Sequence, residues 1–226
     1  MATMYETIMD LPLFKGVSKA HVSLFLEKTN IDFCNYEAGE VLIEAGDPVT
    51  MVKFVITGGV RVMRTFHSLP IKVEETCGPG TVLGADRLFG ISTGYAYDVR
   101  SIGKTSIMQF SKEQYVNLLH SDRIYMFNFF NYLSLRAQRQ VETISDYAGS
   151  DLHSRLSIIV SGMTLPTSSD ISIIISDDTL RIFGKMSAEE VEAWKETAIK
   201  KRLISCSHDR INILSRRDFL NRQYVF

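Results

Sequence analysis

Short apolar runs alternate with glycines along the first half of the chain. The runs are rich in β-branched residues and lie at residues 41–43, 52–56, 60–62 and 71–73. Ten of the 14 glycines fall between Gly39 and Gly103, among these runs. Short strands separated by glycine turns are typical of a β-roll, barrel or sandwich. The pattern therefore predicts a β domain over residues 1–110, with one short helix at residues 18–29, N-capped by Ser18, covering one end.

The pattern becomes helical after this domain. Residues 104–148 contain no glycine or proline, which is typical of a long helix, and we assign residues 111–148 to it. Within it a stripe recurs in steps of four and three, the spacing of a coiled-coil seam: Met126, Phe130, Leu133, Ala137, Gln140 and Ile144. The stripe either pairs two chains or packs on the chain's own sheet. Pairing is favoured, because Phe127 and Phe129 widen the apolar face enough to serve both.

A second domain is expected after Gly149, which ends the long helix. Its predicted elements are a helix at residues 151–162, a strand at 171–175, helices at 177–183 and 187–202, and a hairpin joining 203–206 to 210–214. We therefore predict three segments: the β domain of residues 1–110, the helix of 111–148, and a helix-helix-hairpin domain of 149–226.

Composition and charge place the chain among globular proteins. It has 226 residues, of which 45% are hydrophobic and 23% charged, with a net charge of -1. A nucleic-acid role would therefore need a local basic patch. The three cysteines, Cys34, Cys77 and Cys206, are far apart and odd in number, which excludes a disulfide framework and a CxxC metal knuckle. We find neither a signal peptide nor an apolar run of the ~18 residues that a membrane span needs, so a cytoplasmic protein is expected.

Several short motifs occur in a fixed order. They are Leu-Phe-Lys-Gly at residues 13–16, Tyr-Glu-Ala-Gly-Glu at 36–40, Glu-Ala-Gly-Asp at 44–47, Phe-Val-Ile-Thr-Gly-Gly-Val-Arg-Val at 54–62 and Pro-Gly-Thr-Val-Leu-Gly at 79–84. Together with the helix-helix-hairpin domain, this set resembles the Crp/Fnr family of bacterial transcription regulators along nearly the whole chain.

The resemblance implies an α+β fold. It consists of a cyclic-nucleotide-binding-like β-roll, which is a cupin-like double-stranded roll, then a long dimerisation helix and a C-terminal winged helix-turn-helix. It also implies a cytoplasmic homodimer that binds double-stranded DNA at a promoter operator, with RNA polymerase as a further partner. An effector pocket in each roll would adjust the setting of the two DNA-binding domains.

The effector pocket departs from the family's cyclic-nucleotide pattern. Family members that bind cyclic AMP or GMP carry Gly-Glu for the ribose and Arg-Ser or Arg-Thr for the phosphate, whereas this chain has Gly84-Ala85 and Tyr95-Ala96 there. Arg100 falls several residues late. A buried phosphate without a cationic partner is strongly disfavoured, so no cyclic nucleotide is expected. The candidate pocket includes Tyr97 beside these residues; it suits a flat, apolar effector or is filled by its own side chains.

Other cofactors and enzyme chemistry find little support. The family's iron-sulfur members use four cysteines, three of them near the N-terminus, and only Cys34 lies in the first 70 residues here, which excludes that cluster. Haem ligation by His67 or Cys77 is not expected, because such lone residues in a β-roll are usually structural. The sequence has no P-loop, GxSxG, HExxH or paired Cys/His site, so we predict no enzyme and no metal.

The predicted recognition helix also departs from the family. The usual Ser-Arg-Glu-Thr-Val-Ser-Arg is replaced by Ser-Ala-Glu-Glu-Val-Glu-Ala at residues 187–193, so Ala188 and Ala193 stand at both arginine positions. In the turn before it, Arg181 stands where a small alanine is usual, and Gly184-Lys185 replaces Leu-Gly.

The DNA-binding candidates carry a nearly even balance of charge. They are Ser187, Glu189, Glu190, Lys195, Lys200, Arg210, Arg216 and Arg217. Residues 151–226 hold 11 Lys+Arg against 10 Asp+Glu, and glutamates at 189, 190, 192 and 196 crowd the helix start, where they favour the helix dipole but repel phosphates. The main hypothesis is a DNA-binding regulator whose roll senses an effector other than cyclic AMP, or none. The alternative is a ligand- or partner-binding dimer whose helix-turn-helix no longer reads DNA.

Overall fold

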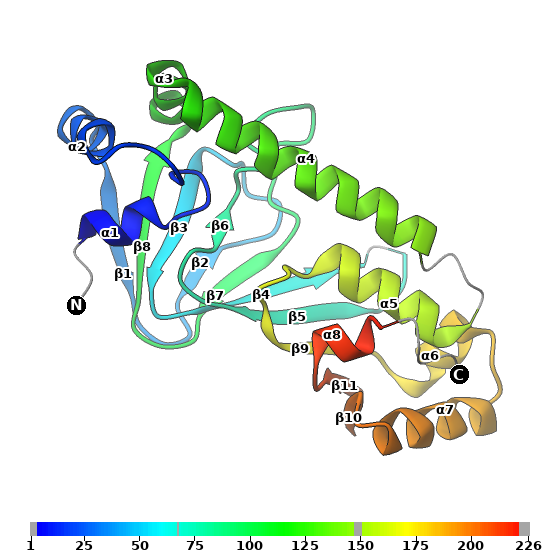
Figure 1. Cartoon of the computed structure of the whole chain (residues 1–226). Helices are drawn as coiled ribbons and strands as arrows, with labels where there is room; N and C mark the ends of the chain where they lie inside the picture. Colours follow the sequence, from blue (N-terminus) through cyan, green and yellow to red (C-terminus); the bar gives the residue numbers. More distant parts are fainter. Residues whose placement is uncertain (1–3, 67, 147–150, 222–226) are drawn as a thin grey trace. The chain divides into compact units, whose positions relative to one another are not determined.

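The computed structural model describes residues 4–66, 68–146 and 151–221, and for residues 140–146 only the backbone. The chain divides into two compact units, each discontinuous in sequence (Figure 1). The first contains Met1–Arg61 and Cys77–Ala137, and the second contains Val62–Thr76 and Gln138–Phe226. The three contiguous segments expected from the sequence thus differ from the contact units, because a hairpin from the first half of the chain belongs to the second unit.

The first unit is built on antiparallel sheets. One sheet has the order β1-β8-β3-β6, and β2 pairs with β7. The strands are β1 (Asp32–Tyr36), β2 (Val41–Ile43), β3 (Met51–Thr57), β6 (Val82–Leu83), β7 (Asp98–Ser101) and β8 (Thr105–Ser111). Gly58 ends β3 with φ of +77°, and a side chain there would clash with the backbone of Lys104. The predicted roll of short strands with glycine turns is confirmed.

Helices complete the first unit and close its aromatic core. They are α1 (Met4–Met9), α2 (Lys19–Lys28), α3 (Lys112–Ser121) and the first part of α4 (Arg123–Asp146). Ser18 caps α2 as predicted, its hydroxyl accepting from the His21 amide at 3.3 Å. The Phe14 ring lies 5.7 Å from Phe54 and 5.6 Å from Tyr125, so strand and helix rings meet in one buried cluster.

The single long helix expected over residues 111–148 is wrong in its first part. Within the glycine-free stretch 104–148, β8 occupies residues 105–111 at the centre of the four-stranded sheet, between β1 and β3. A capping box of Ser111 and Gln114 then starts α3, and extended backbone at Asp122 separates α3 from α4. The Asp122 carboxylate accepts from the Ile124 amide at 2.9 Å, which favours a new helix start. The absence of glycine therefore marks regular structure, not a helix as such.

The second unit contains the predicted helix-helix-hairpin domain. Its elements are α5 (Leu152–Met163), β9 (Ser169–Ile174), α6 (Asp177–Gly184), α7 (Ala188–Lys200), β10 (Ile204–Ser207), β11 (Arg210–Ile213) and α8 (Arg216–Phe219). They match the predicted helices, strand and hairpin to within a few residues. The strand order β10-β11-β9-β5-β4 adds β4 (Val60–Thr65) and β5 (Lys72–Cys77), most of whose residues belong to this unit. No helix of the described residues has the length and apolar character needed to cross a membrane.

Candidate effector pocket and recognition helix

Four of the predicted pocket residues meet inside the roll. The Gly84 amide donates to the Tyr97 hydroxyl at 3.0 Å, and the Tyr95 hydroxyl donates to the Met51 carbonyl at 3.4 Å. The two tyrosine rings lie 5.8 Å apart, each about 5–6% exposed, and Ala85 is buried beside them. Burial raises the pKa of Tyr95 to about 12, so its hydroxyl remains a protonated donor. The chain's own side chains therefore fill this region.

Gly84 itself leaves little room there. Its φ of +85° favours glycine, and a side chain would come within 3.0 Å of Val49 and 3.1 Å of the Tyr95 hydroxyl.

The other two predicted pocket residues lie elsewhere. Ala96 is exposed, and Arg100 is an exposed residue of β7 whose guanidinium donates to the Gly39 carbonyl at 3.2 Å. Arg100 is thus a surface residue that binds the loop before β2, because alternate residues of a half-buried strand face solvent.

The contacts of two charged residues near the pocket, Arg87 and Asp86, were missed by sequence reasoning. Arg87 donates to the Ser92 hydroxyl at 3.3 Å and to the Gly94 carbonyl at 3.5 Å, which ties down the segment before Tyr95. Asp86 lies 3.0 Å from Arg136 of α4. Burial alone would lower the pKa of Arg136, but Tyr132 and Asp86 outweigh it and raise the pKa, so the cation is secure. Fifty positions separate the partners of this ion pair, and no local motif signals it.

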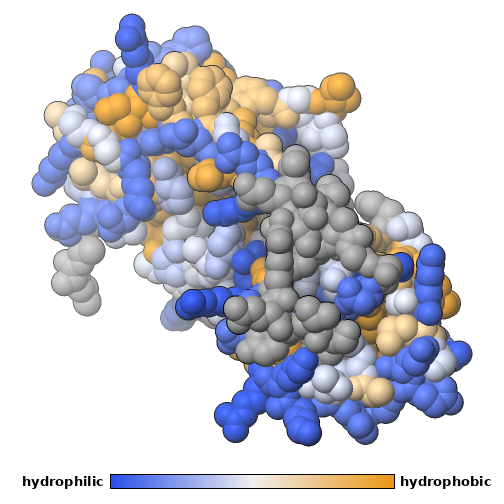
Figure 2. All heavy atoms as spheres, turned by 45° about the vertical axis from the view of Figure 1, so that its right-hand side comes forward, coloured by the Kyte–Doolittle hydropathy of each residue, from blue (hydrophilic) through white to orange (hydrophobic). Residues whose placement is uncertain are grey.

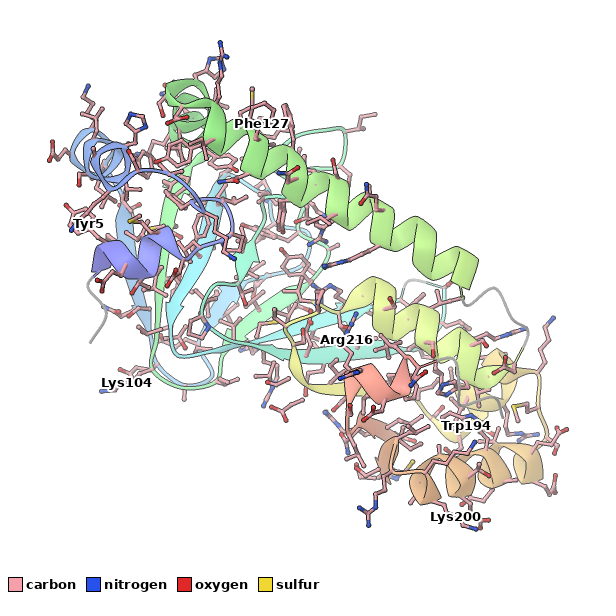
Figure 3. All side chains as sticks on the ribbon, viewed as in Figure 1. Tyr5, Lys104, Phe127, Trp194, Lys200 and Arg216 are labelled. Atoms are coloured by element: carbon pink, nitrogen blue, oxygen red, sulfur yellow. The ribbon has the colours of Figure 1, made fainter. Side chains whose placement is uncertain are left out.

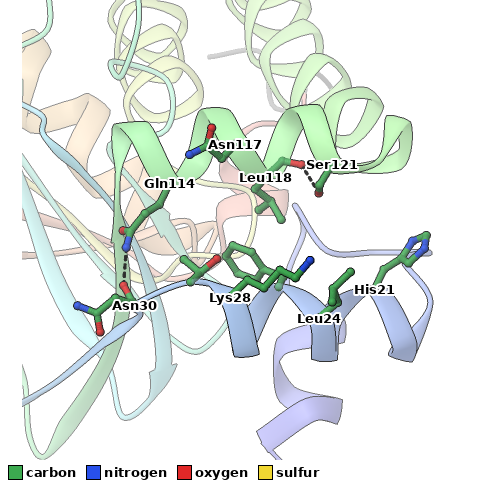
Figure 4. A pocket seen from close by; sticks show the side chains of 10 residues that line it. His21, Leu24, Lys28, Asn30, Gln114, Asn117, Leu118 and Ser121 are labelled. Atoms are coloured by element: carbon green, nitrogen blue, oxygen red, sulfur yellow. Dashed lines mark hydrogen bonds between the residues drawn. The ribbon is translucent and has the colours of Figure 1, made fainter.

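A different hollow opens between α2 and α3 (Figure 4). It has a volume of about 330 Å³ and is lined by polar and apolar side chains that include His21, Lys28 and Gln114. The Gln114 amide donates to the Asn30 carbonyl at 2.6 Å, and His21 lies 2.5 Å from Asp122. None of the predicted site residues lines this hollow.

The described residues form no cluster of metal-ligating side chains. Among the described residues, no three His, Cys, Asp or Glu side chains gather as a metal would require. Cys77 is buried in the roll, and His67, the other haem candidate, lies outside the described residues.

The start of α7 uses two of the predicted DNA-binding residues as a cap. Glu190's amide donates to the Ser187 hydroxyl at 3.2 Å, and Ser187's amide donates to the Glu190 carboxylate at 2.7 Å. This capping box satisfies amides that the helix leaves open. Hydrogen bonds from the backbone and from Ser187 lower the pKa of exposed Glu189, which therefore stays ionised. The helix start presents negative charge.

Three of the five predicted phosphate-binding side chains hold partners within the chain. Lys195 lies 2.6 Å from Asp177, Arg210 lies 2.9 Å from Glu74, and Arg216 donates to the Thr164 hydroxyl at 3.1 Å. Lys200, at the end of α7, is exposed (Figure 3). Arg217 of α8 is also exposed. The outward positive charge of this unit is therefore smaller than the sequence count indicates.

The turn between α6 and α7 corrects one expectation. Arg181 stands in the sequence where a small residue would pack between the helices, but its side chain is exposed and pairs with Asp178 at 3.2 Å. Close approach instead occurs at Gly184, where a side chain would lie 3.3 Å from Leu152. Lys185 follows in the left-handed conformation, with φ of 56°.

One side of α4 is strongly apolar and exposed. Tyr125 and Phe129 are buried against the roll, whereas Phe127 and Phe130 are 57% and 51% exposed and Leu135 is 50% exposed. Apolar side chains also gather at the surface of this unit in the space-filling view (Figure 2).

The residues of the predicted coiled-coil seam differ in their exposure along α4. Phe130 and Ala137 are exposed, Met126 and Leu133 half-buried, and the side chains of Gln140 and Ile144 lie outside the described residues.

Comparison with known proteins identifies the first unit. Residues 33–122, from β1 to the end of α3, match the cyclic nucleotide-binding domain family. This part of the chain therefore resembles a cyclic nucleotide-binding domain. No curated protein sequence matches the chain.

Solved structures extend the likeness beyond the cyclic nucleotide-binding domain. The catabolite activator protein of Thermus thermophilus is 17% identical, with a TM-score of 0.55 over 92% of this chain and 96% of its own. The c-di-GMP responsive regulator CLP of Xanthomonas campestris is 16% identical, with a TM-score of 0.52 over 88% and 100%. The sensor domain of the regulator DNR of Pseudomonas aeruginosa is 17% identical, with a TM-score of 0.51 over 60% of this chain and 89% of its own. The chain therefore has the fold of Crp/Fnr-type transcription regulators, as the sequence predicts.

Proposed function

We propose that the protein is a dimeric, DNA-binding transcription regulator of the Crp/Fnr type, whose roll senses an effector other than cyclic AMP, or none. The observation that carries this proposal is the order of elements. A cyclic nucleotide-binding roll precedes a long helix, and α6, α7 and the β10–β11 hairpin follow in a second unit. A regulator of this type acts in the cytoplasm, where its promoter and RNA polymerase are found.

The second unit would act as a winged helix-turn-helix. In this arrangement α7 enters the major groove and the β10–β11 hairpin is the wing that touches the backbone. Glu189, exposed and ionised at the helix start, suits cytosine N4, which donates to a carboxylate. Of the five predicted phosphate-binding cations, Lys200 and Arg217 are the two that are exposed. With two such contacts per chain, a dimer would make few phosphate contacts, so a log-log salt slope of about -4 is expected.

The arrangement of the roll argues against a cyclic nucleotide. Tyr95 and Tyr97 occupy the pocket core with their hydroxyls engaged, and Arg136 is already paired with Asp86. A cyclic phosphate would need an unpaired cation in the same place. An effector that enters this roll must displace tyrosine rings, which favours a flat, apolar molecule; without one, the tyrosines themselves keep the roll filled.

The exposed face of α4 supports pairing of two chains. Aromatic side chains that are half exposed on one long helix, such as Phe127 and Phe130, are unusual on a monomer. A second copy of α4 would bury them along a shared seam. Two copies of α7 would then face two half-sites of an operator with two-fold symmetry.

The charge of α7 favours a second candidate function. Glu189, Glu192 and Glu196 are exposed along the helix, and Ala188 and Ala193 leave both arginine positions empty of charge. Such a surface fits a partner protein better than a phosphate backbone. In this alternative the dimer binds a ligand or partner, and the helix-turn-helix no longer reads DNA.

Selection from a pool of random DNA duplexes tests both candidates. The full chain should enrich a two-fold symmetric sequence, and Lys200→Glu combined with Arg217→Glu should weaken its binding by about tenfold or more, since each loses a phosphate contact. The matched control is Lys104→Glu, an exposed lysine of the first unit (Figure 3). Absence of any enriched sequence at low salt would favour the partner-binding alternative.

A further inference from the structure

The hollow between α2 and α3 is held open by a polar contact at each of its ends (Figure 4). At one end the Gln114 amide donates to the Asn30 carbonyl at 2.6 Å, which joins the start of α3 to the segment after α2. At the other end His21 of α2 lies 2.5 Å from the Asp122 carboxylate, which also accepts from the Ile124 amide at the start of α4. Both helices are thus fixed at both ends, and the space between them is built into the fold.

The floor of the hollow is apolar and belongs to the core of the first unit. Phe25 and Leu118 are 8% and 2% exposed, while Leu24, at 46%, is an apolar part of the rim. The Phe25 ring packs edge-on against Phe110, with 5.5 Å between the ring centroids. A close-packed floor of this kind resists collapse, so the hollow keeps its volume of about 330 Å³. This volume lies within the range of small-molecule sites in proteins.

The charge around the hollow is one-sided. None of the ten described residues that line it is an aspartate or a glutamate. Lys28 supplies the one ammonium group of this lining, and no ion pair or hydrogen bond joins that group to another described residue. The amide of Asn117, on the α3 side, is likewise without such a partner among the described residues. Figure 4 shows the Lys28 side chain extending into the hollow, toward Leu118 and Leu24.

We propose that this hollow binds a small organic acid, whose carboxylate pairs with Lys28 and whose apolar body lies on Phe25 and Leu118. The ammonium group attracts an anion, and the apolar floor binds a ring or a short chain by removing it from water. The volume equals that of about ten water molecules, which is enough for such a molecule.

The number of cations decides the class of anion. A single ammonium group balances the single charge of a carboxylate, whereas a phosphate carries up to two charges and is bound best by several donors or by a guanidinium. The hollow contains Lys28 as its one ammonium and no arginine. It shares no residue with the predicted pocket of the roll, and the proposal does not depend on DNA binding.

Calorimetric titration of the full chain with benzoate and with hexanoate tests the proposal. Saturable binding of at least one acid is expected at millimolar concentration. Benzyl alcohol, which has nearly the shape of benzoate but no charge, should bind about tenfold more weakly or worse, because the charge-assisted contact with Lys28 is lost. Inorganic phosphate should also bind more weakly than the acids. Absence of saturable heat with both acids, or tighter binding of benzyl alcohol or phosphate, would overturn the proposal.

Substitution of Lys28 tests where the carboxylate binds. Lys28→Met keeps the apolar stem but removes the charge, so the affinity for the acid should fall by about tenfold or more. Lys28→Arg keeps a cation and should retain most of the binding. The matched control is Lys104→Met, at an exposed lysine that does not line the hollow, and it should bind like the wild type (Figure 3). An unchanged affinity in Lys28→Met would place the acid elsewhere and reject the site.

A pair of variants at Leu24 gives a second test that differs in charge alone. Leu24→Glu places a carboxylate four residues before Lys28 on α2, where the two side chains can pair. The new carboxylate competes with the ligand, so Leu24→Glu should bind the acid about tenfold more weakly than Leu24→Gln. Both variants should fold, because Leu24 is 46% exposed. Equal affinities of the two variants would contradict a carboxylate bound at Lys28.

Amide chemical shifts of the full chain locate the bound acid. Titration of the wild type with benzoate should shift amides of α2 and α3 and leave those of β9 and β11 in the second unit unchanged. The Lys28→Met variant should lose these shifts at the same concentration of benzoate. Shifts confined to the second unit, or spread evenly over both units, would overturn the assignment of the site.

Discussion

The predicted pocket of the roll and the surface of α7 both lack charged residues that the resemblance to the Crp/Fnr family implies, but the two regions differ in burial. In the roll, Ala85 and Tyr95 stand at the family's polar positions, and they are buried in a closed arrangement. On α7, Ala188 and Ala193 stand at the arginine positions, and both are exposed among glutamates.

The difference is one of burial. A buried site that loses its charged groups must fill the space with side chains, because an empty or unpaired polar interior is costly. An exposed site can lose them freely, because water solvates whatever remains. The predicted pocket of the roll is therefore a packed core, while α7 is an open surface that can bind a partner.

The largest expected effect comes from emptying the closed site. Tyr97→Ala should lower the free energy of unfolding of the roll by about 3–5 kcal/mol, because it leaves a cavity and an unsatisfied Gly84 amide. Urea denaturation measures the loss. Addition of a phenol, which matches the missing ring, should restore part of the stability. A loss below about 1 kcal/mol would mean that Tyr97 does not fill the pocket.

A smaller effect is expected from restoring charge to the open site. Ala188→Arg combined with Ala193→Arg should raise affinity for the selected duplex about tenfold at low salt, because each arginine can reach bases or phosphates. Fluorescence anisotropy with a labelled duplex gives the dissociation constant. Ala20→Arg, at an exposed alanine of α2, controls for net charge. An equal rise with this control would show that the position on α7 is irrelevant.

A substitution in the turn before α7 should change the free energy of unfolding by about 1 kcal/mol. Lys185 adopts a left-handed conformation in which a side chain is strained, so Lys185→Gly should raise the free energy of unfolding by about 1 kcal/mol. Lys200→Gly, in the last turn of α7, should lower the free energy of unfolding, since glycine disfavours a helix. Thermal unfolding of both variants gives the comparison, and a Lys185→Gly variant that is less stable than wild type would contradict the account.

Addition of cyclic AMP should have no effect on stability. Cyclic AMP at millimolar concentration should leave the melting temperature of the wild-type chain unchanged, because binding to the native state alone would raise it. The measurement is a thermal scan with and without the nucleotide, with adenosine as the control. A clear upward shift with cyclic AMP would mean that the roll opens to a phosphate after all.

Local sequence signals predicted most of the elements. The cap at Ser18 lies where it was expected, because its side chain accepts from the His21 amide within the first turn of α2. The strands and hairpin of residues 169–213 follow from runs of β-branched residues bounded by turns. These features depend on neighbours along the chain.

Long-range contacts were not predictable in the same way. Strand β8 was not predicted individually, although it lies within the predicted β domain, because its pairing with β1 and β3 depends on distant residues. The Asp86–Arg136 ion pair and the hydrogen bond from the Leu165 amide to the Glu75 carboxylate join positions far apart in sequence. Neither contact is signalled by a motif. Arg100 was placed in the pocket by alignment, although strand alternation turns it to solvent.

Hydroxyl-radical footprinting on the selected duplex tests the central claim most directly. A dimer that inserts two copies of α7 should protect two segments related by two-fold symmetry and spaced about one helical turn, 10–10.5 base pairs, apart. Combining Ala188→Arg with Ala193→Arg should deepen protection at the same positions. Uniform protection along the duplex, or none at low salt, would contradict sequence reading by α7 and leave the protein as a dimer that binds something other than DNA.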